Sequence, residues 1–152
     1  MYKRQALGPD HPSVATDLSY VGRALADLGR AAEALPLHQR ALGIREAALG
    51  PDHPDVAIDL DQVGRALADL GRAAEALPLH QRALHIDEAA LGPDHPSVAT
   101  DLSYVGRALA GLGRAAEALP PRQRALRIRE AALGPDHPLT RQSRTYVEAQ
   151  SQ

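Results

Sequence analysis

Apolar residues recur at steps of three and four along most of the chain, which is the spacing of an amphipathic helix. One stripe consists of Leu18, Val21, Gly22, Leu25 and Leu28. A second consists of Ala31, Ala34, Leu35, Ala41, Leu42 and Ile44. The pattern predicts helix A from about Pro12 to Leu28 and helix B from about Arg30 to Ala48, with Gly29 breaking the chain between them.

This predicted helix pair is repeated. The string LGPDHP begins at Leu7, Leu49, Leu91 and Leu133, so the period is 42 residues. We divide the chain into full copies over 7–48, 49–90 and 91–132 and a partial copy, or capping helix, over 133–152. Residues 1–6 align with the tail of a preceding helix B. Gly50-Pro51 is a typical helix stop, and Asp52 is the expected N-cap of the next helix A.

Glycine and proline occupy unusual places inside the predicted helices. Gly22, Gly64 and Gly106 lie within helix A, where glycine costs about 1 kcal/mol relative to alanine. We expect helix B of the same pair to approach closely there. Pro36, Pro78 and Pro120 lie within helix B and predict a bend or a loosened turn near Ala32 and its equivalents. Pro120-Pro121 should disturb the third helix B most.

Composition excludes several classes of protein. Cysteine is absent, so neither a disulfide framework nor a thiolate metal site is possible. The net charge of −2 provides no strong field for nucleic acid, and no basic stripe with interleaved aromatic residues occurs. We find no membrane span and no signal peptide, so a cytoplasmic protein is the expectation. Arginine greatly outnumbers lysine, a bias that resembles GC-rich bacterial coding sequences.

Several of the repeated residues resemble the pattern of a known family. Leu18, Val21-Gly22, Leu25, Gly29, Ala34 and Ala41 resemble the tetratricopeptide repeat. The unit GRAAEALPLHQRAL followed by LGPDHPDVA is similar to the 42-residue variant found in kinesin light chains and many bacterial proteins. The resemblance covers about residues 7–138. It implies an all-α fold, a right-handed solenoid of antiparallel helix pairs, whose helix A residues line a concave peptide-binding groove. His38, His80 and Arg122 depart from the aromatic residues usual in the family, which should weaken core packing.

The expected groove consists of helix A residues that lie off the apolar stripe. They are Thr16, Ser19, Tyr20, Arg23, Asp27, Ile58, Asp61, Gln62, Arg65, Asp69, Thr100, Ser103, Tyr104 and Arg107, followed by Gly111. The first two copies differ at six positions, and four of the differences fall on or beside this set. Either a binding face varies on a fixed frame, or exposed positions have drifted.

Three arginines should form a ladder along the groove. Arg23, Arg65 and Arg107 could grip the main chain or the acidic side chains of a partner, together with Tyr20 and Tyr104. The alternative is that they pair with acids one turn on, such as Asp27 and Asp69. Bases minus acids give net charges of −1, −5 and +2 for the three copies. This asymmetry could orient a partner or a second copy, or it could be unselected surface charge.

The sequence offers no cofactor site and no catalytic constellation. His11, His53, His95 and His137 recur once per copy in the loops, too sparsely for a metal site, and we expect each to pack against the next repeat. No nucleophile elbow, phosphate loop or carboxylate pair occurs, so we do not expect an enzyme.

Two functions remain open from the sequence. The first is a protein-interaction scaffold that binds a peptide segment of a partner. The second is a self-assembly module, natural or designed, that stacks head to tail or exchanges helices. The second reading arises because residues 2–6 are too short to cover the first helix A.

Overall fold

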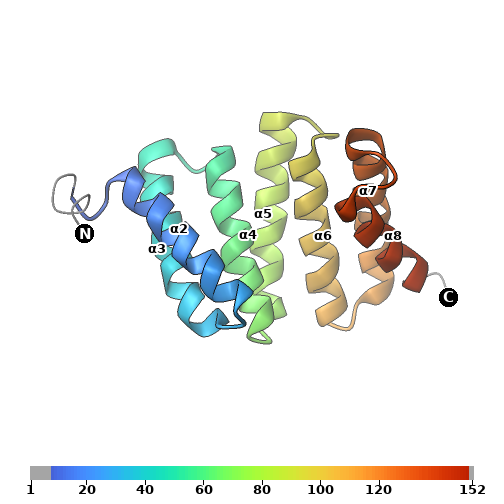
Figure 1. The fold of residues 1–152 in the computed structure, drawn as a ribbon, viewed down its shortest axis with the longest axis horizontal. Helices are drawn as coiled ribbons and strands as arrows, with labels where there is room; N and C mark the ends of the chain where they lie inside the picture. The colour runs from blue at the N-terminus through green and yellow to red at the C-terminus, as the bar shows by residue number, and fades with distance from the viewer. Residues whose placement is uncertain (1–7, 151–152) are drawn as a thin grey trace.

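The structure, a computed structural model, describes residues 8–150, which form seven α-helices and no strand. The assignment of residues 1–6 to a preceding helix B lies outside the described residues. The helices are α2 (Pro12–Asp27), α3 (Ala31–Leu49), α4 (Pro54–Asp69), α5 (Ala73–Leu91), α6 (Pro96–Gly111), α7 (Ala115–Leu133) and α8 (Pro138–Gln150). They follow one another in chain order from one end of the molecule to the other (Figure 1). The all-α fold and its pairing of successive helices are confirmed.

Each helix A begins at a histidine rather than at the aspartate expected from the sequence. The backbone N–H of Ser13 donates to Nδ1 of His11 (3.1 Å), and that of Asp55 donates to Nδ1 of His53 (3.0 Å). Proline follows the histidine at the first helical position, where its missing N–H leaves no bond unmade. The prediction of Asp52 as N-cap is therefore wrong. The repeated histidines cap helices, and no contact with the next repeat is needed to explain them.

The turn between helix A and helix B requires glycine. Gly29 has φ of 76°, which residues with a Cβ rarely adopt. The N–H of Arg30 donates to the carbonyl of Leu25 (2.8 Å), and that of Gly29 donates to Ala26 (3.0 Å). This pair of bonds is the Schellman motif, which satisfies the last carbonyls of the helix.

The internal prolines do not interrupt helix B. Helices α3, α5 and α7 each run for 19 residues through Pro36, Pro78 and Pro120-Pro121. The double proline leaves α7 as long as the others. Each first proline removes the bond to a carbonyl at the start of its helix, where only one turn has to adjust.

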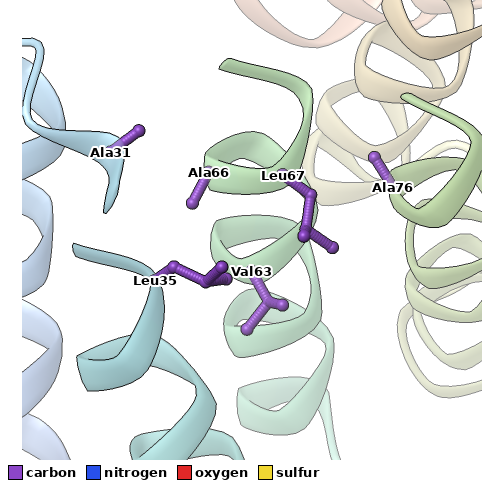
Figure 2. Close-up of a cluster of buried hydrophobic side chains, with 6 residues drawn as sticks. All are labelled: Ala31, Leu35, Val63, Ala66, Leu67 and Ala76. Carbon is purple, nitrogen blue, oxygen red and sulfur yellow. The ribbon is translucent and has the colours of Figure 1, made fainter. Parts of the chain in front are cut away.

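The core alternates between contacts within a pair and contacts between pairs. Within the first pair, Val14 and Leu18 of α2 pack against Ala41 and Ile44 of α3. Between pairs, Leu35 of α3 packs with Val63 and Leu67 of α4, and Ala76 of α5 closes the same cluster. Figure 2 shows Leu35 and Val63 pointing toward one another, with Leu67 extending toward Ala76. Because every helix between the ends takes part in both kinds of contact, the apolar core is continuous along the array.

The glycines inside helix A face a bulky side chain of helix B. A Cβ built on Gly22 would lie 2.7 Å from the His38 ring, and one on Gly64 would lie 2.5 Å from His80. At Gly106 the neighbour is Cγ of Arg122 at 2.8 Å. The expected close approach of helix B is therefore confirmed. Both His38 and His80 are fully buried, so they fill the site that larger aromatic rings would otherwise take.

Candidate peptide-binding groove

A groove crosses the helix A side of the array. One cavity, of about 590 Å³, is lined by Arg23, Gln62, Arg65, Thr100, Ser103, Tyr104, Arg107, Arg122, Arg129, Leu139, Gln142, Ser143 and Tyr146. A second, of about 180 Å³, is lined by Thr16, Ser19, Tyr20, Arg23, Arg45, Asp55, Ile58, Asp59 and Gln62. The two share Arg23 and Gln62, so they form one continuous surface. We call this surface the groove.

Most of the residues expected in the groove line it. The structure places Thr16, Ser19, Tyr20, Arg23, Ile58, Gln62, Arg65, Thr100, Ser103, Tyr104 and Arg107 on its walls. Asp27 and Asp69 are exposed beside it and pair with groove arginines. Asp61 does not face the groove. It is buried, and its carboxylate Oδ1 lies 2.8 Å from Nδ1 of His80 on helix B of the same repeat.

The His80–Asp61 pair supports one of the groove tyrosines. The Tyr104 ring stacks on His80 with centroids 4.8 Å apart and planes 5° from parallel. Burial raises the pKa of Tyr104, and the nearby Asp61 carboxylate adds to this. Tyr104 is therefore a neutral hydrogen-bond donor, held rigidly on the groove wall by the repeat beneath it.

The arginine ladder pairs across repeats. Arg65 Nη2 donates to Asp27 Oδ1 of the preceding repeat (3.0 Å), and its own Asp69 one turn on lies 4.0 Å away. Arg107 in turn bonds Asp69. The alternative of pairing with acids thus describes Arg65 and Arg107, although the closer acid belongs to the neighbouring repeat. Each pair is partly exposed, so it adds only about 0–1 kcal/mol to stability while it orients the guanidinium.

Residues 45, 87 and 129 are equivalent in helix B, and each contacts the next helix A differently. At the first junction, Arg45 Nη1 bonds the buried Asp59, and it also donates to Ser19 Oγ (2.9 Å). At the second, Asp87 replaces arginine and meets Asp101, so two buried carboxyls face each other. At the third, Arg129 Nη1 donates to Ser143 Oγ (2.7 Å).

The residues at each junction affect the pKa of the buried aspartates there. Burial raises the pKa of Asp59 to about 6, even though Arg45 opposes the shift. Burial also raises the pKa of Asp101 far above its ordinary value of 3.8, and the adjacent Asp61 and Asp87 carboxyls raise it further. Among the described residues, no donor reaches Asp101 Oδ2. The raised pKa keeps a proton on Asp101, which lets this carboxyl donate to the neighbouring Asp61 and Asp87 carboxylates.

The end of the groove near α8 was not predicted from the sequence. Arg122 and Arg129 come from helix B, whereas the prediction used helix A alone. The Arg122 guanidinium lies 5.0 Å from the Tyr146 ring centroid, and its Nη1 donates to Gln150 Oε1 (2.9 Å). The signal that could have found these residues is the change from His38 and His80 to Arg122 at an otherwise repeated position.

The sequence of this chain matches the model of a known protein family. The tetratricopeptide repeat model matches residues 18–89 and 59–131, which together are more than half of the chain. The chain belongs to the tetratricopeptide repeat family. As a tetratricopeptide repeat protein, it provides a module for contacts between proteins. No curated protein matches its sequence.

Solved structures of other proteins share this fold. A protein described as a kinesin light chain from Podosopora anserina, with nearly identical TPR-like repeats, is 24% identical at a TM-score of 0.83 over 92% of this chain. BtubC (BKLC) from P. vanneervenii is 20% identical at a TM-score of 0.81, also over 92% of this chain. The chain spans 66% and 56% of the lengths of those two proteins, respectively. At these identities the likeness concerns the fold alone.

The described residues contain no group of three or more histidine, aspartate or glutamate side chains arranged to hold a metal ion. No helix among them is long and apolar enough to cross a membrane.

Proposed function

We propose that this protein is an interaction scaffold that binds an extended peptide segment of a partner in the groove. The observation that carries the proposal is the combination of a cavity of about 590 Å³ with five arginines and two tyrosines on its walls, and no acidic residue among its lining. Arginine donates to carboxylates and to main-chain carbonyls, and tyrosine adds rigid contact area.

The geometry of two wall residues supports a preformed site. Tyr104 is held by its stack on His80, and Arg65 is held by Asp27. Side chains that are already ordered lose less conformational entropy when a ligand binds, which raises affinity without new contacts. Such a groove suits a peptide without regular structure, because ordering the peptide then costs more entropy than ordering the groove side chains.

Groove variants test the proposal. The protein is immobilised, partners are captured from its source, and capture is compared between the unchanged chain, Arg65→Ala and Tyr104→Ala. We expect both substitutions to abolish capture of the same partner. Arg127→Ala is the matched control, because Arg127 is exposed on α7 and does not line the groove. A partner that all three variants still capture binds elsewhere, and the groove proposal then fails.

A second candidate function is stacking of one copy on another. Val21 and Leu28 of α2 are 53% and 71% exposed, whereas Val63, the equivalent of Val21 in α4, is 3% exposed beneath Leu35. The exposed face of α2 therefore carries the apolar side chains that, on α4, are covered by helix B of the preceding repeat.

Sedimentation distinguishes the two candidates. Stacking predicts a mass that rises with concentration and returns to that of a monomer in Val21→Glu. Arg65→Ala and Tyr104→Ala should leave such assembly unchanged, since neither residue lies on that face. A monomer at high concentration would exclude stacking and leave the groove proposal intact.

A further inference from the structure

Arg129 is a buried guanidinium that has no acidic partner among residues 8–150. Its equivalent at the first junction, Arg45, bonds Asp59, but the position of Asp59 is taken by Ser143 at the third junction. Arg129 is 4% exposed and donates to Ser143 Oγ through Nη1 alone. The serine hydroxyl satisfies one donor without supplying the negative charge that the aspartate provides.

The neighbours of Arg129 do not supply that charge either. Burial lowers the pKa of Arg129, and the only opposing influence is the phenol of Tyr104. Burial likewise lowers the pKa of Arg122, opposed by Tyr146 alone. Among the described residues, no carboxylate pairs with either guanidinium. Two partly desolvated cations on one cavity wall are unfavourable unless an anion joins them.

The cavity brings these two arginines to a surface that a ligand can reach. Arg122, Arg129, Ser143 and Tyr146 all line the larger part of the groove. Thr140 is fully buried on α8 and donates to the Arg129 carbonyl (3.2 Å), which fixes α8 against α7 at this point. The site is therefore built by packing and does not depend on freely moving surface side chains.

We propose that the α7–α8 end of the groove is a carboxylate site, in which Arg129 and Arg122 bind an acidic side chain of the peptide. The carboxylate takes the place that Asp59 fills at the first junction, so the partner supplies the missing anion. The proposal rests on the peptide-binding function proposed above and specifies that its segment carries glutamate or aspartate. Arginine binds carboxylates through two parallel hydrogen bonds, which favours this pairing.

Restoring the internal anion tests the site. The probe is fluorescently labelled hexaglutamate with an amidated C-terminus, titrated with the full chain at low salt and followed by anisotropy. Ser143→Asp recreates the Arg45–Asp59 pair, so we expect it to weaken binding by about tenfold or more. The same substitution should raise the melting temperature, because it pairs a buried charge. Unchanged affinity in Ser143→Asp would overturn the proposal.

Two matched variants separate the site from general electrostatic attraction. Thr145→Asp adds the same charge on an exposed position of α8 and should change affinity by less than about twofold. Thr145→Ala, at the same exposed position, removes a hydroxyl without adding charge, so it should retain binding. If Thr145→Asp weakens binding as strongly as Ser143→Asp, the effect is one of net charge and the site does not exist.

Two further measurements fix the ligand class. Labelled hexaglutamine should not bind, since it lacks the carboxylates. Displacement of hexaglutamate by an equal concentration of inorganic phosphate would overturn the assignment to carboxylates. If Ser143→Asp leaves partner capture unchanged while Arg65→Ala abolishes it, the carboxylate site is wrong and the groove proposal stands.

Discussion

Single residues of this chain have roles that depend on one opposing side chain. The residues at positions 22, 64 and 106 are glycine because a histidine ring or the side chain of Arg122 occupies the space of a Cβ. The sequence predicted the close approach correctly, since glycine inside a helix requires a compensating contact. It did not identify which side chain approaches, because the facing of helix B residues depends on how the two helices cross.

Gly64→Ala should destabilise the protein by about 1–3 kcal/mol, although alanine is the better helix former. The added methyl group would meet His80 at 2.5 Å. Gly43→Ala is the control, because Gly43 lies within α3 with nothing within 4 Å of the added Cβ. That variant should gain up to about 1 kcal/mol. Urea unfolding measures both, and equal changes in the two variants would contradict the packing argument.

His38 and His80 occupy equivalent positions but should respond oppositely to substitution. Among the described residues, no side chain bonds either ring nitrogen of His38, which has only the Gly22 backbone near it, whereas His80 bonds the buried Asp61. His38→Leu should therefore be neutral or stabilising. His80→Leu leaves a buried carboxylate unpaired and should cost about 1–3 kcal/mol. Thermal unfolding at pH 8 compares the two, and a loss in His38→Leu as large as that in His80→Leu would contradict this view.

The pH dependence of His38 follows from its burial. Burial lowers the pKa of His38 below its ordinary value of 6.5, so the unfolded chain binds more protons just below that pH. Stability is then present above pH 6.5 and falls as the pH is lowered through this range. His38→Leu should reduce this loss between pH 7 and 5.5. An identical pH profile in the variant would show that His38 does not contribute.

At the scale of helices, the junctions share one apolar frame and differ in their polar contacts. The sequence predicted the frame, because the apolar stripe is nearly unchanged among copies. It did not predict that Arg45 meets Asp59, since residues on different repeats come together only through the stacking geometry. The replacement of Arg45 by Asp87 was visible among the six differences, yet nothing in the sequence showed what either residue faces.

The second junction should lose stability as the pH rises above about 3.8, and this loss should continue above neutral pH. The raised pKa of Asp101 means that the folded chain binds a proton that the unfolded chain releases above about pH 3.8. The surrounding groups are Asp61 and His80 within repeat 2, Asp87 of α5, and His95 before α6. Stability from this group is full below pH 3.8 and declines toward the folded pKa, by up to about 1.4 kcal/mol per pH unit.

Asp87→Arg tests this junction because it copies the first one. The variant should flatten the decline in urea stability between pH 7 and 9 and should stabilise the protein at pH 9. Asp17→Asn is the control, since Asp17 holds the equivalent position of Asp101 but is exposed on α2. A decline of the same slope in Asp87→Arg would show that the carboxyl pair does not cause it.

At the scale of the whole molecule, each repeat contacts only its neighbours, so the least favourable junction limits cooperativity. We expect hydrogen exchange at pH 9 to divide the chain between α5 and α6, with α6, α7 and α8 opening as one unit. At pH 6.5 the described helices should exchange more nearly as a single unit than at pH 9. Opening that starts between α3 and α4 instead would place the weakest junction elsewhere.

The cross-repeat contact of helix B also governs how such an array can lengthen. Asp17, Asp59 and Asp101 hold the same place in the three full copies, so a unit that ends like the first, with arginine, can precede any of them. A unit that ends like the second sets carboxyl against carboxyl whichever full copy follows. Tandem duplication of the gene can therefore add units of the first kind freely, whereas each added unit of the second kind brings another buried proton into the array.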